Sequence, residues 1–135
     1  MAEPDIASMS FEQALLELER IVSELESGRA ELESSINAYE RGAALKAHCE
    51  AKLEAARLRV EMAQAQRNAA EKRARLAVES RGFFAKSFRL GESDLPTRLR
   101  VELEAVEAER QAARARIDHA AAVSSLRQAL GLLPE

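Results

Sequence analysis

Carboxylate side chains are the groups in this chain that could support catalysis, because clustered carboxylates bind Mg²⁺ for metal-assisted hydrolysis, as in DNA-cleaving enzymes. The 135 residues include 23 acidic side chains, but the only aspartates are Asp5, Asp94 and Asp118. Each aspartate fits a terminus, a helix cap or a helix surface, and the glutamates fall mostly at exposed helical positions. We therefore expect no catalytic residue, no metal site and no cofactor in this chain.

Histidine and cysteine are the other residues that could bind a metal or act in catalysis. His48 and Cys49 are adjacent, so they point about 100° apart on a helix and cannot face one metal together. Cys49 falls on an apolar stripe, which favours a small buried thiol. His119 is isolated and fits a partly exposed helix side chain. A single cysteine also excludes an intramolecular disulfide framework.

Arginines could bind nucleic acid, and the chain has two groups of them. Arg110 and Arg114 share one helix face, and Arg67, Arg73 and Arg75 form a basic patch. Residues 1–62 carry 7 basic and 13 acidic side chains, whereas residues 63–135 carry 13 and 10. Because DNA binding depends on neutralising phosphates, the acidic half is a poor candidate for direct contact with DNA. The arginines fit a salt-bridged helix surface better than a nucleic-acid interface.

The elements that position these residues are all predicted to be helices. Aromatic residues make up only 4% of the chain and charged residues 32%, a composition typical of long helices and coiled coils. A first helix is expected from Ser10, which forms a capping box with Gln13, to Gly28, which suits the left-handed end of a helix. Its apolar residues have a heptad spacing: Phe11, Leu15, Leu18, Val22 and Leu25.

A second, long helix is expected from about Leu32 to about Leu90, because neither glycine nor proline occurs between Gly42 and Gly82. Its apolar residues form two stripes, with a register shift near Gly42: first Leu32, Ile36, Tyr39 and Ala43, then Cys49, Leu53, Ala56, Val60 and Ala63. We expect the first helix to pack antiparallel on these stripes. The apolar surface left over would then bind partner helices.

A turn and a third helix complete the chain. Gly91 is expected to close the second helix, and Ser93 or Asp94 to cap the next, with Pro96 in its first turn. The third helix should end near Gly131. The apolar residues that mark this helix are Leu99, Leu103, Val106, Ala113, Ile117 and Ala120. The fold class is therefore all-α, an antiparallel helical hairpin extended into a long coiled-coil hairpin.

Residues 8–62 resemble a known family through an ordered set of landmarks: Phe11, Leu25-Glu26-Ser27-Gly28, Leu32, Ser35, Tyr39-Glu40-Arg41-Gly42, Leu45, Cys49, Leu53 and Val60. This pattern is similar to the small subunit of exodeoxyribonuclease VII. Glu31 departs from that family, which usually places Ser, Thr or Pro before the leucine that opens the second helix.

The resemblance implies an accessory subunit without catalytic residues, because the nuclease centre of that enzyme belongs to its large subunit. The enzyme degrades single-stranded DNA to acid-insoluble oligonucleotides and then to smaller ones. Several copies of the small subunit are expected to bind each large subunit. Contact with single-stranded DNA is expected to be only indirect. The residues expected to bind the partner are Phe11, Leu15, Leu18, Val22, Leu25 and Tyr39.

The tail, about residues 67–134, carries a second resemblance. Phe88-Arg89-Leu90-Gly91-Glu92-Ser93 and the ending Gln128-Ala-Leu-Gly-Leu-Leu-Pro look like a helical hairpin of the TolC-type outer-membrane efflux channel family. That family implies a hairpin tip that meets an adaptor protein, which is our alternative function; a plain structural coiled coil is a third. A natural fusion, a gene-boundary accident and an engineered chimera all fit this tail.

These features give a domain plan and a location. We expect a disordered segment at 1–9, the nuclease-subunit-like hairpin at 10–66 and the coiled-coil hairpin at 67–135. The N-terminus lacks the basic and apolar regions of a signal peptide, and no run of about 20 apolar residues could span a membrane. We therefore expect a cytoplasmic protein without membrane contact.

Overall fold

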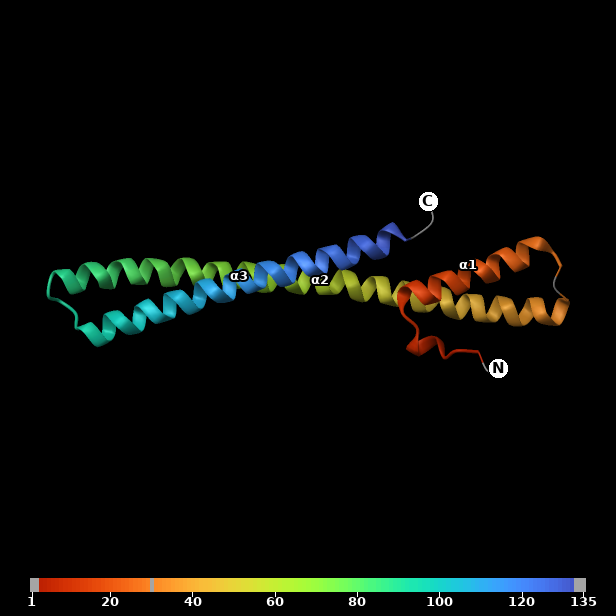
Figure 1. Ribbon diagram of the computed structural model, residues 1–135, viewed down its shortest axis with the longest axis horizontal. Coiled ribbons are helices and arrows are strands. Elements are labelled where there is room, and N and C mark those ends of the chain that lie inside the picture. Colours follow the sequence, from red (N-terminus) through yellow and green to blue (C-terminus); the bar gives the residue numbers. More distant parts are fainter. Residues whose placement is uncertain (1–2, 30, 133–135) are drawn as a thin grey trace. The chain divides into compact units, whose positions relative to one another are not determined.

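The computed structural model describes residues 3–29 and 31–132, and all regular structure in these ranges is helical. A short 3-10 helix, η1 (Ile6–Ser8), precedes three α-helices: α1 (Phe11–Ser27), α2 (Leu32–Arg89) and α3 (Leu95–Gly131) (Figure 1). The predicted all-α fold is confirmed. The contacts divide the chain into two units: unit 1 contains Met1–Leu58 and Ser124–Glu135, and unit 2 contains Arg59–Val123.

The predicted helix boundaries depend on local signals, and the structure confirms them. The side chain of Ser10 accepts a hydrogen bond from the backbone N–H of Gln13 at 3.2 Å, and the Gln13 side chain accepts one from the N–H of Ser10 at 3.0 Å. Gly28 ends α1 in the left-handed region, with φ of 67°. At the turn after α2, Gly91 has φ of 76°. Asp94, rather than Ser93, caps α3 by accepting from the N–H of Thr97 at 3.0 Å.

The segment before α1, for which we expected disorder over 1–9, contains η1 and contacts the hairpin within the described residues. Asp5 caps η1 by accepting from the N–H of Ala7 at 3.2 Å. Met9 is buried in the core of unit 1, and its carbonyl oxygen lies 2.9 Å from Nε2 of His48. Burial of Met9 and the polar contact to α2 together attach this segment to the hairpin. Residues 1–2 lie outside the described residues.

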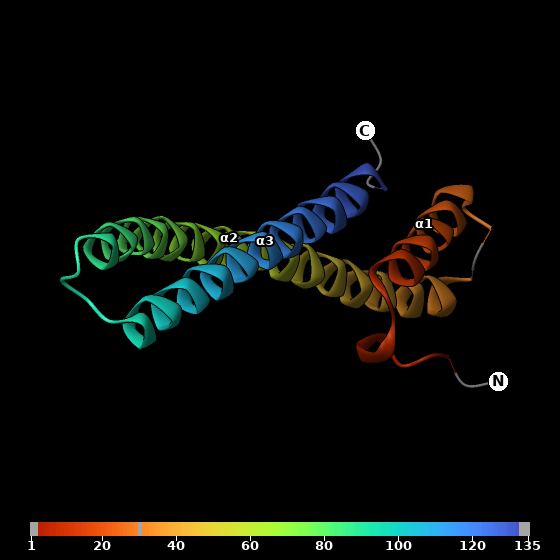
Figure 2. The same ribbon diagram turned by 60° about the vertical axis from the view of Figure 1, so that its left-hand side comes forward.

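In unit 1, α1 lies alongside the first part of α2, and both views show the two helices side by side (Figures 1 and 2). The buried residues of this unit are Met9, Ala14, Leu15, Ile21, Leu45 and Cys49. Phe11, Leu18, Leu25 and Ala38 are partly buried against them. The predicted buried thiol at Cys49 is confirmed, and burial raises its pKa above the ordinary value.

The predicted packing face at the start of α2 is wrong. Leu32, Ile36 and Tyr39 are exposed, and α1 instead packs on the face that carries Ala38 and Leu45. The reason is that small residues on this face let two helices approach closely. A Cβ placed on Gly42 would lie 3.4 Å from Cγ2 of Ile21 and 3.7 Å from Cδ1 of Leu18. Gly42 therefore does not mark a break in α2 but lies at the contact between the helices.

In unit 2, α2 and α3 pack through alanine. The buried cluster consists of Ala70 and Ala74 from α2 with Ala112 from α3, and Ala108 and Ala115 pack against it. Val101 and Ala105 are also buried. The large apolar residues Leu99, Leu103, Val106 and Ile117 of α3 are exposed. Small residues again occupy the helix contact, and the larger apolar side chains lie outside it.

Candidate partner-binding groove

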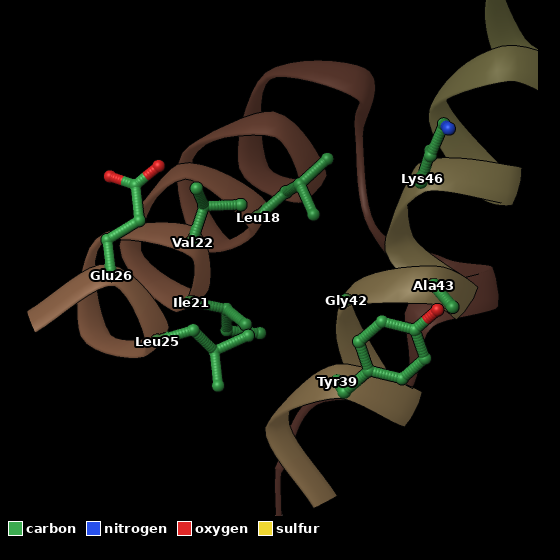
Figure 3. A pocket seen from close by; sticks show the side chains of 9 residues that line it. All are labelled: Leu18, Ile21, Val22, Leu25, Glu26, Tyr39, Gly42, Ala43 and Lys46. Carbon is green, nitrogen blue, oxygen red and sulfur yellow. The ribbon is translucent and has the colours of Figure 1, made fainter. Parts of the chain in front are cut away.

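An apolar groove of about 550 Å³ lies between α1 and α2 in unit 1. Its lining comes from both helices: Leu18, Ile21, Val22, Leu25 and Glu26 of α1, and Tyr39, Gly42, Ala43 and Lys46 of α2. Figure 3 shows the α1 side chains along one wall and Tyr39 on the α2 wall. Gly42 has no side chain and Ala43 only a methyl group, so these two residues take up little space on the α2 side of the groove.

The structure brings four of the six predicted partner-binding residues into this groove: Leu18, Val22, Leu25 and Tyr39. Val22 and Tyr39 are exposed, whereas Leu18 and Leu25 also pack against the core. The other two lie elsewhere. Leu15 is buried in the core of unit 1 and Phe11 is partly buried against that core. The apolar stripe on α1 is thus wide enough for one edge to pack in the core and the other edge to line the groove.

An ion pair ties the two helices together beside this groove. The guanidinium of Arg41 donates to both carboxylate oxygens of Glu17, through Nε to Oε1 and through Nη2 to Oε2 at 3.2 Å. Nη2 also donates to the carbonyl oxygen of Pro4 at 3.0 Å, and Nη1 lies 3.3 Å from Oε2 of Glu3. The hydrogen bonding between the Glu17 and Arg41 side chains lowers the pKa of Glu17 and raises that of Arg41. Arg41 therefore joins α1, α2 and the segment before α1.

Sequence reasoning missed three contributors to this unit. Ile21 was passed over because Val22 fits the same heptad, and Ala14 because it is small; both are buried. Glu17 and Arg41 are 24 positions apart in the sequence, and no local pattern predicts that they pair. A usable signal did exist for Gly42, because a glycine inside a long helix often marks a close backbone approach.

The other candidate chemical groups have structural roles. His48 contacts the carbonyl oxygen of Met9, and Nδ1 of His119 lies 3.3 Å from Nη1 of Arg67. Arg67 and Arg116 both bind Glu71, with Nε–Oε1 distances of 3.2 and 2.8 Å. Arg110 binds Glu107 at 2.8 Å through Nη2. Among the residues that the structure describes, no group of three or more His, Cys, Asp or Glu side chains could hold a metal ion.

Comparison with known proteins decides the family. A family model described as exonuclease VII small subunit matches residues 11–62. The exodeoxyribonuclease 7 small subunit of Phenylobacterium zucineum is 76% identical over 62 residues, which cover 45% of this chain and 78% of that protein. The chain belongs to the exonuclease VII small subunit family. In Caulobacter vibrioides (strain NA1000 / CB15N) a protein of the same name is 75% identical over 57 residues, 42% of this chain and 68% of its own length.

The match to the exonuclease VII small subunit family concerns the first part of the chain. A relative with the same name in Novosphingobium aromaticivorans is 55% identical over 65 residues. The aligned residues make up 48% of this chain and 78% of that protein. These comparisons do not support the resemblance of residues 67–134 to efflux channels. No solved structure matches the chain. Within the described ranges, no helix is long and apolar enough to cross a membrane.

Proposed function

We propose that this chain is the accessory, non-catalytic small subunit of an exodeoxyribonuclease VII, and that the α1–α2 groove binds the large subunit. Membership of the small-subunit family supports the first part, and the exposed apolar groove supports the second. The large subunit supplies the cleavage of single-stranded DNA, and this chain acts on DNA only through that subunit. We place the complex in the cytoplasm, and residues 10–66 are the part of the chain that assembles it.

The groove fits an amphipathic helix of the large subunit. Such helices insert apolar side chains at i, i+3 and i+4 into a hydrophobic groove. Val22 and Leu25 supply aliphatic surface on one wall, and the Tyr39 ring supplies the other, with a hydroxyl free to bind a polar group of the partner. Glu26 and Lys46 lie among the lining residues and place one charge of each sign beside the apolar surface. This combination favours a partner with a defined orientation.

Copurification with the large subunit tests the proposal. The full chain, coexpressed with a tagged large subunit, should copurify with it and should restore exonuclease activity on single-stranded DNA. Tyr39→Asp replaces a ring that is 70% exposed, so the hairpin should still fold. A charge in an apolar interface is costly, and we expect the variant to bind at least about tenfold less tightly.

Leu16→Asp is the matched control. Leu16 is 67% exposed on α1 but does not line the groove. Like Tyr39→Asp, this variant replaces an exposed large apolar residue with an aspartate. Binding to the large subunit should stay within about twofold of the unmodified chain. Equal losses in both variants would remove the groove as the binding site. A chain that binds no large subunit at all would remove the proposed function.

The efflux-channel alternative has no comparable support. The comparisons favour the nuclease family for residues 11–62 and do not support the channel family for the tail.

A further inference from the structure

The outward face of α3 in unit 2 carries a regular apolar stripe. Its members follow one another at spacings of 4 and 3 residues, and all but Arg110 are apolar: Leu99, Leu103, Val106, Arg110, Ala113, Ile117 and Ala120. The four large apolar members are each more than half exposed, and Leu103 is 71% exposed. The opposite face of α3 already packs on α2 through Ala105 and Ala112. A heptad repeat of this kind is the interface pattern of a coiled coil, so this α3 stripe is suited to a further helix.

The charges that border the α3 stripe have a particular order. With Leu103 and Arg110 at heptad position a, Glu107 and Arg114 occupy position e on one border. Glu109 and Arg116 occupy position g on the other border. Each border therefore carries an acid followed seven residues later by a base. In antiparallel coiled coils the e positions face e and the g positions face g, so this order is self-complementary when a second identical helix runs in the opposite direction.

One register of two antiparallel α3 helices satisfies both borders. It places Leu103 opposite Ala120, Val106 opposite Ile117 and Arg110 opposite Ala113 of the second copy. Glu107 then faces Arg114 of the second copy, and Glu109 faces Arg116 of the second copy. Symmetry repeats each pair. The long aliphatic stem of Arg110 lies over a small alanine, which leaves its charged end in water.

Neighbouring arrangements are less favourable. A shift by one heptad in one direction brings Glu107 opposite Glu107, and a shift in the other direction brings Arg114 opposite Arg114. In a parallel pair, where g faces the following e, Glu102 would face Glu107. Like charges placed opposite one another destabilise a coiled coil, so the borders discriminate against these alternatives.

The bordering side chains are accessible for such contacts. Glu107 is bound to Arg110 on the same helix, and both are about half exposed or more. Glu109 lies 3.6 Å from Arg81 and Arg116 lies 2.8 Å from Glu71, both pairs joining α3 to α2. Glu109 and Arg116 nevertheless keep about half of their side-chain surface exposed. An opposing charge from a second helix would extend these pairs into networks.

We propose that the tail is a self-association module, in which α3 pairs antiparallel with α3 of a second copy of this chain through the α3 stripe. Charge complementarity selects the occupant as a second copy and also its direction. The proposal goes beyond the nuclease role and does not depend on it, because the stripe lies outside residues 11–62 that match the family.

Sedimentation equilibrium of the full chain tests self-association. The unmodified chain should show a concentration-dependent equilibrium between monomer and dimer. Leu103→Glu places a charge within the stripe and should weaken the dimer by about tenfold or more. Leu76→Glu is the control, because Leu76 is 55% exposed on α2 and lies outside the stripe. A chain that stays monomeric up to high micromolar concentrations, or equal effects of the two variants, would overturn the proposal.

A charge exchange tests the direction and register. Glu107→Arg alone and Arg114→Glu alone should each weaken the dimer by about fivefold. In each single variant, positions 107 and 114 of opposite copies carry like charges, and symmetry repeats this repulsive pair. The double variant Glu107→Arg/Arg114→Glu should recover to within about twofold of the unmodified chain. In a parallel dimer, Glu107→Arg would strengthen association, because it would replace the repulsion between Glu102 and Glu107 with an attraction. Failure of the double variant to recover, while its helicity by circular dichroism is normal, would overturn the antiparallel register.

Cross-linking provides an independent readout. A mixture of Val106→Cys and Ile117→Cys chains should form a disulfide between the two kinds of chain. Either variant alone should not, because in this register two copies of position 106 lie about 16 Å apart along the helix axis. The native cysteine, Cys49, is buried and should not form disulfides between chains. The unmodified chain is the control for any cross-linking through Cys49. Efficient cross-linking of Val106→Cys with itself would show the wrong direction.

Discussion

Gly42 of α2 lies directly against Ile21 of α1, and a Cβ at position 42 would be 3.4 Å from Cγ2 of Ile21. This distance is ordinary van der Waals contact, so a methyl group at position 42 fits against Ile21. Leu18, at 3.7 Å from the same Cβ position, closes the other side. The close approach of the two helices thus depends on a small residue at position 42, and not on the conformational freedom of glycine.

Substitutions at Gly42 should therefore have opposite signs. Gly42→Ala should leave the free energy of unfolding unchanged or raise it by up to about 1 kcal/mol, because alanine favours a helix over glycine. Gly42→Leu should lower it by about 2 kcal/mol or more, because the larger side chain forces α1 away from α2. Urea denaturation followed by circular dichroism measures both. If Gly42→Ala destabilised as much as Gly42→Leu, the contact would be tighter than described.

The ion pair between Glu17 and Arg41 should make stability depend on pH. Its hydrogen bonds lower the pKa of Glu17 from the ordinary value of 4.5. A carboxylate with a lowered pKa in the folded state binds protons more readily when unfolded. Its stabilising contribution is therefore complete above the ordinary value and is lost as the pH falls through the lower folded value.

Glu17→Gln removes this contribution and tests it. At neutral pH we expect a loss of about 1 kcal/mol in the free energy of unfolding, since the pair is only partly shielded from water. The difference between the two proteins should shrink as the pH falls below about 4. Thermal unfolding at a series of pH values provides the measurement, with Glu19→Gln as an exposed control. A difference that stayed constant through the acid range would mean that the charge of Glu17 contributes nothing.

The chain alone should not cleave DNA. The structure gathers no group of three or more metal-binding side chains among the residues that it describes, and metal-assisted hydrolysis needs such a group. Purified chain incubated with single-stranded DNA and Mg²⁺ should leave the substrate intact, whereas addition of the large subunit should start degradation. Cleavage that survived stringent purification and disappeared on mutation of one glutamate would contradict this expectation.

Local chemistry explains why the helix boundaries could be predicted from the sequence. The capping box of Ser10 with Gln13 and the left-handed glycines at 28 and 91 each act within a few residues. Such signals can be recognised without knowing what the helix packs against. The all-α class followed for the same reason, since composition and spacing are properties of the sequence itself.

The packing faces could not be predicted in the same way. Sequence patterns favour large apolar residues as the core, and this rule selected Tyr39 on α2 as a packing residue, although Tyr39 is exposed. The core of unit 2 consists instead of alanines, such as Ala74 against Ala112. Small side chains allow close helix contact, and only the partner helix reveals which stripe is used. The candidate groove was predicted in part, because Val22 and Tyr39, which belong to the apolar stripes read from the sequence, both line it.

Truncation after Gln66 should preserve the assembly of the nuclease. The family match ends at residue 62, and the buried core of unit 1 lies between Met9 and Cys49, so residues 1–66 keep both. The end of α3 contributes one hydrogen bond to α1, from Nε2 of Gln128 to Oε1 of Glu12 at 3.5 Å, and its loss should cost little. Copurification with the large subunit and exonuclease activity should match those of the full chain. A truncated chain that stays helical by circular dichroism but does not bind would place part of the tail within the functional unit, and the boundary at residue 66 would be wrong.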